Sequence, residues 1–116
     1  MPSYSQLSTG ATVIRQSLLI QLFGLVWGVL VAATPFPRLA LVVHIEAMTN
    51  GPMWLGVGLL LRTDFLNMAD VGCFLVKASV VGNWITLVVE ILNTWWGTKD
   101  LLSLVCNRMR FCLSKR

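Results

Sequence analysis

Charged residues are scarce in this sequence. Only 12% of the 116 residues are Asp, Glu, Lys or Arg, whereas 56% are hydrophobic, a balance that excludes a disordered chain and fits an ordinary soluble domain poorly. The net charge of +4 comes from basic residues that do not form the concentrated face a nucleic-acid surface requires. We therefore expect a membrane protein whose surroundings are the lipid bilayer. We expect no nucleic-acid partner.

Cysteine and histidine are also scarce. Cys73, Cys106 and Cys112 are an odd set without the C-x-x-C spacing of zinc sites, so the sequence predicts free thiols rather than a disulfide framework or a zinc centre. His44 is the only histidine, so one chain cannot supply both axial imidazoles of a bis-histidine heme. Three alternatives stay open for His44: a heme with a free sixth position, a heme completed by a neighbouring subunit, or no heme.

Long apolar segments are abundant by contrast. They cover about 17–34, 39–61 and 71–96, and each is close to the roughly 20 residues with which a helix crosses a bilayer. The two prolines of 34–38 cannot continue a helix and predict a tight hairpin, and the polar residues of 62–70 predict a second connection. The sequence therefore predicts an all-α fold.

We expect an integral membrane bundle of three transmembrane helices with a degenerate fourth, because only residues 101–106 are continuously apolar after Asp100. This divides the chain into an N-terminal segment at 1–14, a transmembrane bundle at 15–97 and a basic C-terminal tail at 98–116. Apolar residues at helical spacing favour an interfacial helix in the tail: Leu101, Leu102, Val105 and Met109.

The cations predict how a three-span bundle is oriented. Arg38, Lys99 and the four cations of the tail fall on one side, whereas Arg15 and Arg62 fall on the other, so the positive-inside rule predicts a multi-pass protein with a cytoplasmic tail. The alternative for the first apolar segment is a cleaved signal peptide, because Arg15 precedes it and small residues end it. Its length, greater than the usual ~7–15 residues, favours a span.

Polar residues recur at helical spacing within the apolar segments and predict faces that point into the bundle. The third segment carries such a polar stripe at Ser79, Asn83, Thr86, Glu90 and Asn93. The first carries Ser17, Gln21, Gly24 and Gly28, of which the two glycines form a G-x-x-x-G that allows a second helix to approach closely.

Glu46 is the most costly residue of the second segment. An acidic residue near mid-membrane costs about 2.5–3.5 kcal/mol, so Glu46 requires a partner or a proton. Lys77 in the third segment is the candidate basic partner, and a protonated Glu46 is the equal alternative. Since ionisable residues inside membranes are usually functional, Glu46 and His44 become candidate site residues.

The sequence around His44 resembles the hydroxylaminobenzene mutases and the related styrene oxide isomerases. The resemblance covers about 12–97 and rests on Pro37-Arg38, the run from His44 to Gly51 (HIEAMTNG), Asn83-Trp84 and Trp96-Gly97. A glutamate two places after the histidine is closer to the mutase branch. The resemblance implies a small membrane protein of four helices that forms a homotrimer and rearranges a small aromatic substrate without net redox change.

The same resemblance implies roles for individual residues. His44 would be the axial ligand of a heme b between subunits, Asn50 and Glu46 would be the catalytic residues that orient the substrate, and Asn83 and Trp84 would line the substrate pocket. Six residues turn a helix by 600°, so His44 and Asn50 point about 120° apart and would serve one pocket from two different subunits.

Two departures from the family pattern keep a second function open. The fourth span is missing, and the pocket tyrosine of the isomerase branch is replaced near Leu87 by an aliphatic residue, because Tyr4 is the only tyrosine of the chain. The alternative to a heme-dependent isomerase or mutase is therefore a non-catalytic or degenerate multi-pass membrane protein with a structural or assembly role.

Overall fold

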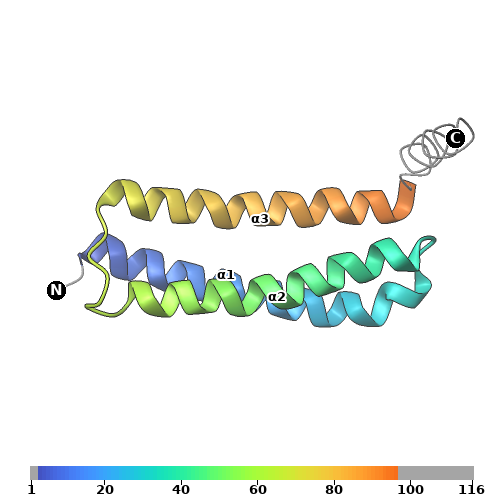
Figure 1. Cartoon of the computed structure of the whole chain (residues 1–116), viewed down its shortest axis with the longest axis horizontal. Helices are drawn as coiled ribbons and strands as arrows, with labels where there is room; N and C mark the ends of the chain where they lie inside the picture. Colours follow the sequence, from blue (N-terminus) through green and yellow to red (C-terminus); the bar gives the residue numbers. More distant parts are fainter. Residues whose placement is uncertain (1–2, 97–116) are drawn as a thin grey trace, which may run out of the picture.

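The described part of the chain is a bundle of three long helices, each antiparallel to the next. A computed structural model describes residues 3–96, which form α1 (Tyr4–Leu30), a short 3-10 turn η1 (Val31–Ala33), α2 (Pro37–Leu61) and α3 (Asp70–Trp96), with no strand among them. α1 and α2 form a hairpin, and α3 runs alongside both (Figure 1). The all-α prediction is confirmed, whereas the predicted degenerate fourth helix and basic tail lie outside the described residues.

The helix ends follow from local chemistry, with one difference from the prediction. Pro37 occupies the first turn of α2, where its missing N–H costs nothing. α3 begins at Asp70, whose carboxylate interacts favourably with the positive N-terminal end of the helix dipole. α1, however, begins at Tyr4 and not near Ser17, because the Ser3 hydroxyl accepts a 3.2 Å hydrogen bond from the Gln6 N–H and caps the helix. α1 therefore includes most of the expected N-terminal segment.

α1 and α2 pack through a seam that repeats every seven residues. The buried residues of α1 alternate in steps of four and three along Gln6, Gly10, Val13, Ser17, Ile20, Gly24 and Trp27. This is the spacing of a left-handed coiled coil. Gly24 and Gly28 lie in close contact with α2, because a Cβ on Gly24 would lie 3.0 Å from Ala47 Cβ. The predicted glycine face of α1 is therefore confirmed.

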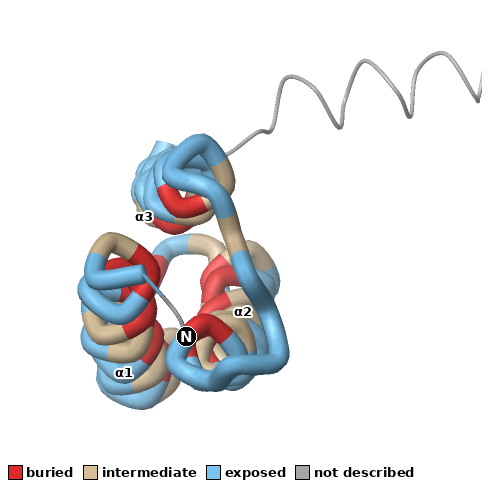
Figure 2. Tube along the Cα trace, turned by 90° about the vertical axis from the view of Figure 1, so that its left-hand side faces the viewer, coloured by how far each residue is buried: buried red, intermediate tan, exposed pale blue. Residues whose placement is uncertain are grey.

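α3 joins this hairpin along a single row. Its buried residues, Cys73, Val80, Leu87 and Thr94, are seven residues apart, and Cys73 is a free thiol. The row corrects the predicted polar stripe, because Ser79 and Thr86 are exposed and donate to the carbonyl oxygens of their own helix. Asn83, Glu90 and Asn93 are half-buried beside the row. Figure 2 shows the buried positions of all three helices facing one another.

The outward faces are apolar. Residues 4–33 and α3 are long and apolar enough to cross a membrane, with mean hydropathies of 1.8 and 1.6. Far more large apolar side chains point outward than inward, an arrangement that soluble monomers avoid and that favours a membrane location. α2 has spanning length but does not reach the same hydropathy, because His44, Glu46 and Asn50 interrupt its middle.

Candidate functional site

A polar cluster joins the middle of α2 to α3. Asn50 Nδ2 donates a 2.6 Å hydrogen bond to Asn83 Oδ1 and a weaker one of 3.4 Å to Glu46 Oε1, one helical turn away on α2. The Glu90 carboxyl of α3 lies close to the Glu46 carboxyl. We call these four residues, Glu46, Asn50, Asn83 and Glu90, the α2–α3 cluster. All four side chains are half-buried.

The α2–α3 cluster retains unused hydrogen-bonding capacity. Asn83 Nδ2 and Glu90 Oε2 are buried, and neither has a hydrogen-bond partner within the described chain. Buried polar atoms without a partner are uncommon, because each costs about 1–3 kcal/mol of desolvation. The cluster therefore offers one amide donor and one carboxyl oxygen to a further polar group.

Glu46 takes its contacts from this cluster and not from Lys77. Within residues 3–96 Glu46 forms no ion pair, and Lys77 lines a pocket between α1 and α3 instead. Of the two expectations for Glu46, the structure thus contradicts the ion pair with Lys77, whereas a protonated Glu46 stays a prediction.

His44 lies on the other side of α2, against α1. Its Nδ1 is 2.8 Å from Gly24 O, and its ring packs directly on Gly28. Because a carbonyl oxygen can only accept, the hydrogen of a neutral imidazole must be on Nδ1, which leaves the Nε2 lone pair free. Nε2 has no hydrogen-bond partner in the described part of the molecule. Metal-binding histidines are typically oriented by this kind of hydrogen bond, so the side chain fits a single axial ligand.

His44 and Asn50 therefore serve different surfaces, as their spacing predicts. His44 contacts α1, whereas Asn50 contacts α3. No group of three or more His, Cys, Asp or Glu residues suited to a metal ion occurs among residues 3–96. His44, the one histidine of the chain, thus lies apart from the α2–α3 cluster.

The two residues expected in a substrate pocket are also separated. Asn83 belongs to the α2–α3 cluster, whereas Trp84 points toward α1, where its Nε1 donates a 3.0 Å hydrogen bond to Gln16 Oε1. The Trp84 ring also makes an edge contact with Phe23, with ring centroids 6.0 Å apart. Consecutive residues on a helix differ by about 100°, so Asn83 and Trp84 cannot easily line one pocket.

Two glutamines of α1, Gln6 and Gln16, were missed by sequence reasoning, whereas Gln21 was among the residues expected to face the bundle. Gln6 is fully buried and bonds to Leu61 O, Leu66 O and the Met68 N–H. Gln16 Oε1 accepts a hydrogen bond from Trp84 Nε1, and Gln21 contacts Gly51 of α2. The seven-residue spacing that places Gln6 on the same row as Val13 and Ile20 was the available signal.

Comparison of the chain with protein-family models, curated proteins and solved structures finds no match. The site must therefore be interpreted from its own geometry.

Proposed function

We propose that this chain is a small multi-pass membrane protein that binds one heme b through His44 and rearranges arylhydroxylamines or aryl epoxides. The observation that carries the proposal is the orientation of His44, whose Nδ1 hydrogen bond to Gly24 O leaves Nε2 available as a ligand. A heme at this position would supply an iron that acts as a Lewis acid on an oxygen or nitrogen atom of the substrate.

The α2–α3 cluster supplies the groups that such a reaction needs from the protein. An intramolecular rearrangement consumes no co-reactant, so one group that accepts and returns a proton is sufficient. Glu46 and Glu90 offer a carboxyl pair for that purpose, while the amides of Asn50 and Asn83 can orient a polar substrate atom. Asn83 Nδ2 is a buried donor without a partner and suits the substrate oxygen.

The proposal requires a second copy of the chain. His44 and Asn50 leave α2 in different directions, so a site that uses both takes His44 from one subunit and the α2–α3 cluster from its neighbour. We propose a homotrimer in which α2 crosses the membrane together with α1 and α3. Packing between subunits would cover the polar middle of α2, which lipid solvates poorly.

The test is an absorbance spectrum of the detergent-solubilised protein after expression with ample heme. His44→Ala should abolish the Soret band, whereas Asn50→Ala should keep the band and lose turnover of an arylhydroxylamine or aryl epoxide. Val88→Ala, at an exposed position of α3, is the control for both measurements. Folded, trimeric wild-type protein without a heme band would refute the heme-dependent reaction.

A second function, a non-catalytic membrane protein with a structural or assembly role, is favoured by a different observation. Asn50 pairs with Asn83, and Trp84 pairs with Gln16, so several polar side chains are already occupied in joining helices. If this function is correct, Asn50→Ala should weaken helix association in a protein that never had a heme band.

A further inference from the structure

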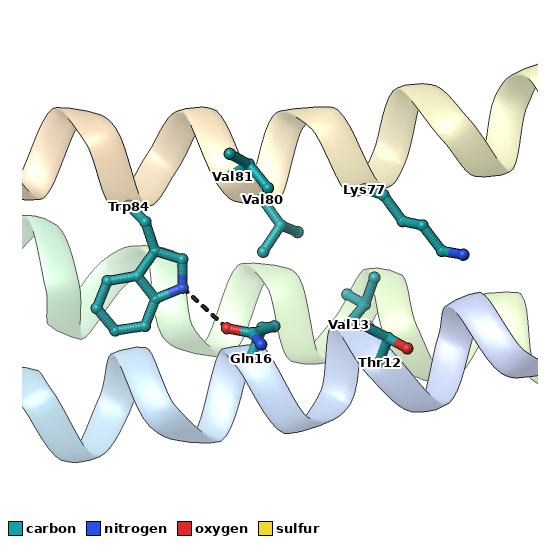
Figure 3. Close-up of a pocket in the computed structure, with 7 residues that line it drawn as sticks. All are labelled: Thr12, Val13, Gln16, Lys77, Val80, Val81 and Trp84. Carbon is teal, nitrogen blue, oxygen red and sulfur yellow. Dashed lines mark hydrogen bonds between the residues drawn. The ribbon is translucent and has the colours of Figure 1, made fainter.

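A pocket lies between α1 and α3, on the face of the bundle away from the α2–α3 cluster. It has a volume of about 300 Å³ and is lined by Thr12, Val13, Gln16, Lys77, Val80, Val81 and Trp84. Figure 3 shows Lys77 near one end and the Trp84 indole at the other, with the valines between them. The size is at the lower end of the range for small-molecule sites.

Two polar groups of this pocket, Gln16 Nε2 and the Lys77 ammonium, are donors without an acceptor in residues 3–96, whereas the Thr12 hydroxyl donates to Ser8 O. Gln16 Oε1 is occupied by the Trp84 N–H, which leaves the Gln16 Nε2 hydrogens unused. The Lys77 ammonium has no anionic partner in residues 3–96, because Glu46 and Glu90 belong to the α2–α3 cluster. The pocket thus has a positive charge at one end and apolar side chains along its length. This arrangement is complementary to an anion that carries an apolar chain.

The position of Lys77 along α3 fits the same ligand. It follows the start of the helix by seven residues, about 10 Å at 1.5 Å per residue, and precedes Trp84 by another 10 Å or so. A lysine at that depth extends its ammonium toward the lipid headgroups while its methylenes stay in the apolar region. From Lys77, Val80 and Val81 line the pocket toward the middle of α3, which is the direction that acyl chains take in a bilayer.

We propose that the α1–α3 pocket binds a single anionic amphiphile, with its carboxylate or phosphate on Lys77 and its acyl chain along Val80 and Val81 toward Gln16 and Trp84. This ligand is distinct from the aromatic substrate proposed above. The site does not depend on His44, heme or a second subunit.

The experiment uses acyl chains brominated at mid-length, which quench tryptophan fluorescence on contact. The full chain in neutral detergent is titrated with dibromostearate, dibromo-phosphatidylglycerol and dibromo-phosphatidylcholine. Saturable quenching by one or both anionic probes, but not by the zwitterionic one, is expected, and Trp84→Phe should remove it. Quenching by stearate alone identifies a free fatty acid as the ligand, and quenching by phosphatidylglycerol alone identifies a phospholipid.

Matched variants at exposed positions separate the pocket from general lipid contact. Lys77→Gln should weaken binding of the anionic probe about fivefold, the effect of one charge near a membrane surface. Arg38→Gln, at the opposite end of the bundle, should not. Val81→Phe should fill the pocket and block binding, whereas Val88→Phe should leave it intact. Equal quenching by phosphatidylcholine, or unchanged binding in folded Lys77→Gln and Val81→Phe proteins, would show annular lipid only and overturn the proposal.

Discussion

Gly28 should be a position where a single methyl group destabilises the bundle. A Cβ on Gly28 would lie 2.7 Å from His44 Cε1 and 2.8 Å from His44 Nδ1, closer than nonbonded carbon atoms normally approach. The imidazole would have to move, and its 2.8 Å contact with Gly24 O would be lost. Gly28→Ala is therefore expected to disturb the one interaction that orients His44.

The expected magnitude is a difference between two effects. Overpacking a helix interface costs typically 1–3 kcal/mol, and losing a buried hydrogen bond adds about 1 kcal/mol. Replacing a helical glycine by alanine stabilises the helix by up to about 1 kcal/mol, which offsets part of these costs. Gly28→Ala should thus lower the free energy of unfolding by about 1–3 kcal/mol. Gly56→Ala and Gly82→Ala should raise it, because a Cβ at either glycine would have no atom within 4 Å.

Unfolding in mixed detergent micelles, followed by circular dichroism, measures these differences. The decisive comparison repeats Gly28→Ala in a His44→Ala background, where the obstructing ring is gone and the new methyl group should stabilise the helix. A coupling free energy of about 2–4 kcal/mol between the two positions is expected. If Gly28→Ala stabilised the protein as much as Gly82→Ala does, or gave the same change with and without His44, the reasoning would be refuted.

Three further substitutions test contacts between helices. Asn83→Leu should lower the free energy of unfolding by about 0.6–2 kcal/mol, the range for interhelical hydrogen bonds in membranes, while Val88→Leu at an exposed position should change it little. Gln6→Leu should cost about 2–3 kcal/mol and speed proteolysis of the 62–69 connection, whereas Thr12→Ala, which loses a bond only within α1, should leave that rate unchanged. Trp84→Phe should cost about 1 kcal/mol by releasing Gln16, visible as a lower midpoint in the same detergent titration.

The sequence was informative where the controlling physics is local. Prolines at 35 and 37 predicted the hairpin, and the spacing of Ser17, Gln21, Gly24 and Gly28 predicted the face of α1 that packs on α2. The spacing of His44 and Asn50 likewise predicted that these residues face different neighbours. These inferences need only the geometry of one helix, so they hold without knowledge of the assembled bundle.

Predictions failed where tertiary contacts decide. A search for apolar segments could not place the start of α1 at Tyr4, because Gln6 is buried only through hydrogen bonds to a connection about 60 residues away in the chain. Nor could spacing show that Ser79 satisfies its own helix and has no need of a protein-facing position. The choice of a partner for Glu46 depended on which side of α3 meets α2, which composition does not reveal.

Because α3 contacts the hairpin along a single row, apolar packing alone does not fix its position along the bundle axis. Because Cys73, Val80, Leu87 and Thr94 repeat every seven residues, sliding α3 by one repeat would still bring apolar residues against apolar residues. Directional bonds do not tolerate such a slide, which would carry Asn83 and Trp84 about 10 Å away from Asn50 and Gln16. These two polar pairs therefore fix the register of α3 against the hairpin. A variant that lacks both pairs should remain helical but should no longer have a single register.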